Sequence, residues 1–110
     1  MYRATTPKHI FSFDVDPNDT FAVIEITYVQ DGNIVLQKSK TDLTFEAEKD
    51  KCGMYVCWLQ LTQQETKMFQ ANARAVYDIQ VRVKTYGDEV IAFPIARRSV
   101  EDVLCDEVIP

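Results

Sequence analysis

The feature that most constrains the fold is the alternation of apolar and polar residues over residues 73–86. One set of alternating positions is apolar and the other is largely polar: Ala75, Tyr77, Ile79, Val81 and Val83 against Val76, Asp78, Gln80, Arg82 and Lys84. This period of two predicts a β-strand with one buried face and one solvated face. Gly87 and Asp88 follow, and residues 89–98 resume an apolar pattern, so the two stretches are predicted to form a β-hairpin.

Earlier segments carry the same kind of signal. Strands are predicted at residues 8–14, 21–30, 33–39, 42–46 and 54–61. Asp31 and Gly32 separate the second and third of these, and this pair favours a type I′ hairpin turn. Residues 16–19 predict a turn, because proline presets φ and Asn and Asp bond their own backbone. Thr62 and Glu65 form a capping-box pattern, which predicts a short helix over residues 63–70.

About seven strands joined by tight turns, with one short helix before the penultimate strand, indicate an all-β fold. The predicted architecture is an immunoglobulin-like antiparallel β-sandwich, and a closed barrel is the alternative. A chain of 110 residues has the size of one domain. Residues 1–110 are therefore expected to form a single domain, with residues 99–110 as a C-terminal arm or a short helix.

Composition narrows the class of partner. The net charge is −5, and an acidic chain repels phosphate backbones, so nucleic acid is not the expected partner. No apolar run is long enough to span a bilayer, and no signal peptide is visible, which predicts a soluble cytoplasmic protein. The odd number of cysteines favours free thiols, although a bridge between Cys52 and Cys57 stays open.

The sequence contains few residue patterns that are typical of a catalytic or metal-binding site. Any Ser-His-Asp or Cys-His site must use His9, which is expected to be a surface histidine beside a strand. Two further clusters fit known metal sites poorly: Cys52, Cys57, Cys105 and His9 for zinc, and Asp14, Asp16, Asn18 and Asp19 for calcium. No glycine-rich phosphate loop occurs. The prediction is a protein that is not an enzyme, with no catalytic residues, no cofactor and no metal.

One strand gives a hint of an interface. Residues 54–61 are largely apolar on both faces, so this strand is expected to be central or covered. Met54, Val56 and Trp58 are the candidate interface residues, on the face that a partner subunit would cover. Trp58 is at the same time favoured as a core aromatic, because a sandwich of this type is expected to hold one large ring in its centre.

Two resemblances add to this interpretation. Residues 61–65 followed by residues 75–83 resemble the E–F corner and F strand of immunoglobulin-like domains. The resemblance implies that Tyr77 is the structural tyrosine corner, with its hydroxyl bonded to backbone upstream. The cysteine pair of antibody domains is absent, and Ile24 or Ile26 and Ile79 or Val81 stand at its expected places.

The second resemblance covers nearly the whole chain. Residues 1–11, 26–32, 61–66 and 79–85 resemble a small protein that recurs in phages and prophages of Gram-positive gut bacteria. The resemblance implies a virion structural or accessory module of head, tail or baseplate, whose partners are other virion proteins or further copies of itself. It implies residence in the host bacterial cytoplasm during assembly and then in the virion. The alternative is a carbohydrate- or host-surface-binding module.

Overall fold

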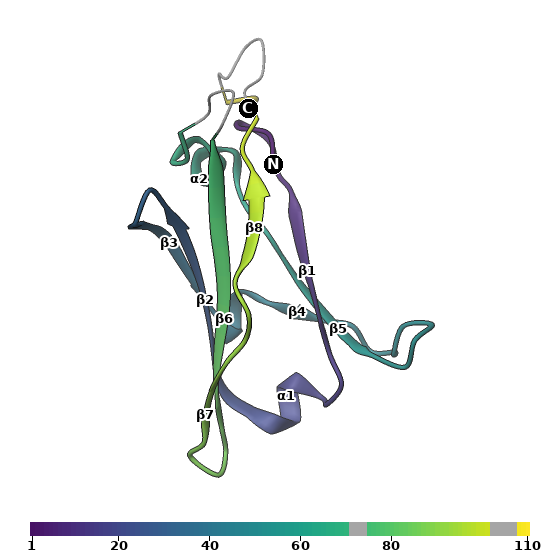
Figure 1. The fold of residues 1–110 in the computed structure, drawn as a ribbon. Helices are drawn as coiled ribbons and strands as arrows, with labels where there is room; N and C mark the ends of the chain where they lie inside the picture. The colour runs from purple at the N-terminus through teal and green to yellow at the C-terminus, as the bar shows by residue number, and fades with distance from the viewer. Residues whose placement is uncertain (71–74, 102–107) are drawn as a thin grey trace.

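A computed structural model of the protein describes residues 1–70, 75–101 and 108–110. These residues form eight β-strands in two antiparallel sheets, so the predicted β-sandwich is confirmed (Figure 1). The elements are β1 (Lys8–Phe13), α1 (Pro17–Thr20), β2 (Phe21–Gln30), β3 (Asn33–Ser39), the 3-10 turn η1 (Lys40–Asp42), β4 (Thr44–Phe45), β5 (Tyr55–Gln60), α2 (Gln63–Lys67), β6 (Val76–Thr85), β7 (Val90–Ala92) and β8 (Ala96–Ser99).

The order of the strands defines the immunoglobulin-like arrangement. The smaller sheet has the order β1-β5-β4, and the larger has the order β3-β2-β6, with β7 and β8 both paired to β6. These orders correspond to strands B-E-D and C′-C-F-G of an immunoglobulin domain. Helix α2 lies between β5 and β6, where such a domain has its E–F corner. The first residues add a parallel bridge to this arrangement, between Tyr2 and Glu101.

The larger sheet corrects one sequence interpretation. Ile26 lies directly opposite Val81, and Tyr28 opposite Ile79, because β2 and β6 are neighbours in the same sheet. The isoleucines of β2 therefore do not stand at the place of a cysteine that would join the two sheets. The hairpin between β2 and β3 is as predicted, since Asp31 and Gly32 both have positive φ, at 53° and 77°.

The predicted strand over residues 89–98 is divided in two. Phe93 still donates its backbone N–H to Val81 O at 2.9 Å, but the next residue is Pro94, which has no N–H to donate. Pairing with β6 stops there and resumes at β8, which raises the number of described strands to eight. In the preceding turn the left-handed residue is Asp88, with φ of 65°, and not Gly87.

Both short helices begin with a side-chain cap. Thr62 Oγ1 accepts from Glu65 N at 3.1 Å and Glu65 Oε1 accepts from Thr62 N at 2.9 Å, which confirms the capping box. Helix α2 ends at Lys67, earlier than predicted, and Phe69 then turns into the core, where it contacts Tyr28. The turn predicted at residues 16–19 is the single helical turn α1, capped by Asp16.

The C-terminal residues lie close to α2. The Gln63 side-chain amide donates to Ile109 O and accepts from Ile109 N, each at 2.7 Å. The arm or helix predicted for residues 99–110 falls largely on residues 102–107, which lie outside the described part of the chain. Among the described residues, no helix has the length and apolar character needed to cross a membrane.

Candidate functional site

An apolar stripe lies on the outer face of the smaller sheet. Ile10 of β1 pairs with Trp58 of β5, and Ser12 pairs with Val56, so the outward side chains of the two strands stand side by side. Met54 precedes β5 in the same alternation. Ile10 is 66% exposed, and the other three apolar residues are half-buried. We call Ile10, Met54, Val56 and Trp58 the outer stripe.

Trp58 lies on this outer stripe and not in the core, so the expectation of a central tryptophan is wrong. The face of β5 that points inward carries Cys57 and Leu59, both of which are buried. Residues next to β5 on both of its sides hold the Trp58 ring: Glu46, which follows β4, and Lys8 of β1. Nε1 donates to Glu46 Oε1 at 2.8 Å, and Lys8 Nζ lies 4.2 Å from the ring centre.

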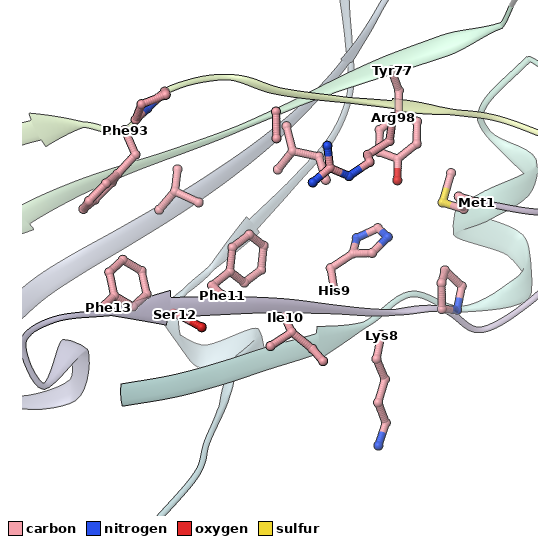
Figure 2. Close-up of a pocket in the computed structure, with 15 residues that line it drawn as sticks. Met1, Lys8, His9, Ile10, Phe11, Ser12, Phe13, Tyr77, Phe93 and Arg98 are labelled. Carbon is pink, nitrogen blue, oxygen red and sulfur yellow. The ribbon is translucent and has the colours of Figure 1, made fainter. Parts of the chain in front are cut away.

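The second candidate surface is a groove between the open edges of the two sheets. Residues 7–13 form one wall, and residues of β6 and β8 with Phe93 and Pro94 form the other (Figure 2). The groove has a volume of about 580 Å³. We call it the edge groove. Phe11 and Phe13 point into it at one end, and His9 lies nearer Tyr77 and Arg98 at the other end.

His9 points into the sandwich, so the prediction of a surface histidine is wrong. Its Nδ1 and the Tyr28 hydroxyl are 2.6 Å apart. Tyr28 is fully buried and has no other side-chain acceptor among the described residues, so its hydroxyl donates to Nδ1 and leaves the proton of the neutral imidazole on Nε2. Burial raises the pKa of Tyr28, which keeps the phenol protonated.

The environment of His9 favours its neutral form. Burial lowers the pKa of His9 below 6.5, and the positive charges of the amino terminus and Arg98 lower it further. The groove residues that surround the ring include no cysteine and no carboxylate in the described part of the chain. The histidine is therefore not brought together with a nucleophile or with a group that would orient it as a base.

This shift gives a first prediction. His9 is the single histidine of the chain, so its imidazole proton signals can be followed by NMR without ambiguity. We expect a titration midpoint below 6.5, and a higher midpoint in Arg98→Ala, which lacks one of the repelling charges. Since the unfolded chain binds the proton first, the free energy of unfolding should fall as the pH falls below 6.5. A midpoint at or above 6.5 would contradict the burial of this ring.

Tyr77, predicted as the tyrosine corner, lies in the core beside the edge groove. Its ring stacks on Tyr28, with 6.2 Å between ring centres, and burial raises its pKa. No hydrogen bond joins its hydroxyl to another described residue. The backbone upstream that a tyrosine corner would reach includes residues 71–74, which lie outside the described residues, so this role stays a prediction.

The remaining metal candidates that the structure describes do not converge on a metal, and Cys105 lies outside the described part of the chain. Asp16 uses its carboxylate to cap α1, where Oδ1 accepts from Asn18 N at 3.0 Å. Within the described ranges no group of three or more His, Cys, Asp or Glu side chains is placed to hold a metal ion. Cys52 is exposed, Cys57 is buried, and both thiols are free, which answers the question of a bridge between them.

Comparisons with known proteins do not assign the chain to a family. A scan of protein-family models, a search of curated proteins and a search of solved structures each gave no match to this chain. The function proposed below therefore rests on the outer stripe and on the sequence resemblance.

Proposed function

We propose that this protein is a non-catalytic interaction module that attaches to another protein subunit through its outer stripe. In keeping with the sequence resemblance, the subunit belongs to a phage or prophage particle, where the module has a structural or accessory role in head, tail or baseplate. The observation that carries the proposal is the row of apolar side chains on the outer face of β1 and β5, in which Glu46 and Lys8 hold the Trp58 ring in place.

The surroundings of the stripe resemble those of a protein interface. A typical interface has an apolar centre with a large aromatic anchor and a polar rim. Here the four residues of the outer stripe form the apolar part, and Lys8, Thr44 and Gln60 of the register positions next to Trp58 are polar and exposed. Because Glu46 and Lys8 already fix the tryptophan ring, little side-chain entropy remains to be lost on binding.

A carbohydrate-binding role is supported less well. Sugars stack on an open aromatic face, and the Lys8 ammonium group lies over the Trp58 ring at 4.2 Å from its centre. A host-surface glycan would have to displace this cation or use the other side of the ring. A glycan array with the purified protein tests this alternative, and saturable binding that Trp58→Ala abolishes would replace the proposed function.

The proposed function is tested with a matched pair of variants. Ile10 and Ile34 are the same residue type, are 66% and 62% exposed, and lie on strands of opposite sheets. The tagged protein is co-expressed with the products of the adjacent genes, and self-association is measured by light scattering. We expect one of these complexes to form, and Ile10→Ser to weaken it at least tenfold while Ile34→Ser does not.

Two results would overturn the proposed function. The first is a strictly monomeric protein that binds none of the neighbouring gene products. The second is a complex that both serine variants weaken equally, since the attachment would then not depend on the face that carries Trp58.

A further inference from the structure

The edge groove exposes unpaired backbone as well as apolar side chains. Leu61 N donates to Pro7 O at 3.0 Å, and the register of β1 with β5 continues from that pair. Hydrogen-bonded positions alternate in antiparallel pairs, so His9, Phe11 and Phe13 direct their backbone groups at β5. The N–H and C=O groups of Lys8, Ile10 and Ser12 then face the groove, and no backbone bond with another described residue occupies them.

The residues that line the groove agree with this direction of the backbone groups. Lys8 and Ile10 are lining residues, yet their side chains point away from the groove in Figure 2. They line it with their backbone. Beneath this edge, Phe11, Val81 and Phe93 provide an apolar floor. An unpaired strand edge above an apolar floor is the geometry that accepts an added strand.

The groove also has a charge preference. Although the chain is acidic, with a net charge of −5, the described lining residues include Arg98 and no acidic side chain. No carboxylate of the described residues pairs with Arg98. Glu101, the nearest acidic residue along the chain, is held by the Met1 amino group at 2.8 Å. A carboxylate in the groove would therefore meet a cation that no carboxylate of the described residues neutralises.

From these features we infer that the edge groove binds an extended, acidic segment of a partner protein as an additional strand beside β1. The segment has an apolar residue at every second position, which covers Phe11, Val81 and Phe93, and a carboxylate at the end beside Arg98. A strand that covers β1 has about six residues and a length of about 20 Å. The groove uses the backbone of Ile10 and the outer stripe uses its side chain, so either site can fail without the other.

The binding mode is tested with two synthetic peptides of alternating valine and threonine, one ending in glutamate and the other in lysine. Binding is measured by fluorescence anisotropy. We expect the glutamate peptide to bind at least tenfold more tightly than the lysine peptide, and Arg98→Glu to reverse the order. Absence of saturable binding by the glutamate peptide, or an unchanged order in the Arg98→Glu protein, would overturn the inference.

Two further measurements locate the added strand. Amide hydrogen exchange should show slower exchange at Lys8, Ile10 and Ser12 when the glutamate peptide is bound. Ser12→Pro removes one outward N–H and should weaken binding about tenfold, whereas Ser12→Ala keeps that N–H and should bind like the unaltered protein. Protection confined to β5 or to the larger sheet would overturn strand addition, and this readout does not depend on the folding of the proline variant.

Discussion

Replacing Phe69 with alanine is expected to lower the free energy of unfolding by about 3–5 kcal/mol, a large fraction of the stability of a domain of this size. The Phe69 side chain is 1% exposed, and its ring centre lies 5.2 Å from Tyr77 and 6.0 Å from Tyr28. Truncation would leave a cavity between α2 and the larger sheet that these rings cannot fill.

The neighbouring methionine provides the control. Met68 is 54% exposed, so Met68→Ala should change the free energy of unfolding by less than about 0.5 kcal/mol. Urea denaturation of the two variants, with the slope compared between them, measures both values. Similar losses for the two variants would mean that the turn after α2 is not anchored by Phe69.

The second large effect concerns the thiols. In the folded protein we expect Cys57 to react with iodoacetamide at least 100-fold more slowly than Cys52. Cys57 is fully buried, and burial raises its pKa to about 11, whereas Cys52 is exposed. A rise of two pKa units alone lowers the thiolate fraction about 100-fold, and the thiolate is the reacting species. Peptide mapping by mass spectrometry assigns the label to each cysteine.

Denaturation supplies the comparison for this experiment. In concentrated urea the two cysteines should react at similar rates, because the environment of Cys57 is lost. The raised pKa of Cys57 also makes the free energy of unfolding depend on pH. The stability that the buried neutral thiol contributes is present below pH 9 and is lost as the pH rises through about 11. Equal rates in the folded protein would show that β5 opens readily.

Local patterns predicted much of the fold because they act within a few residues. The alternation in β6 and the Asp31–Gly32 turn depend only on adjacent residues, and both are found as predicted. The capping box of Thr62 and Glu65 is similar, since each side chain bonds the backbone of the other. The length of α2 was not predictable in this way, because Phe69 leaves the helix to reach the core.

The candidate site was harder to predict, because it depends on contacts between segments that lie far apart in the sequence. Residues 54–61 are apolar at nearly every position, so periodicity alone does not decide which face is inward, and the size of Trp58 favoured the wrong one. The edge groove joins residues 7–13 to residues 93–98, and no short-range pattern connects these segments. Pro94 did indicate an interrupted edge strand, because proline has no N–H to donate. It does not indicate that residues 7–13 form the other wall of the groove.

Asp50 gives the charged loop before β5 a structure of its own. Its Oδ1 accepts from Cys52 N at 2.8 Å and from Met54 N at 2.9 Å, and its N–H donates to Met54 O at 2.9 Å. These bonds close residues 50–54 into a turn. The conformational entropy of this loop is lost when the chain folds and not when two molecules bind. A contact that includes Met54 would therefore form without the entropic cost of ordering a flexible loop.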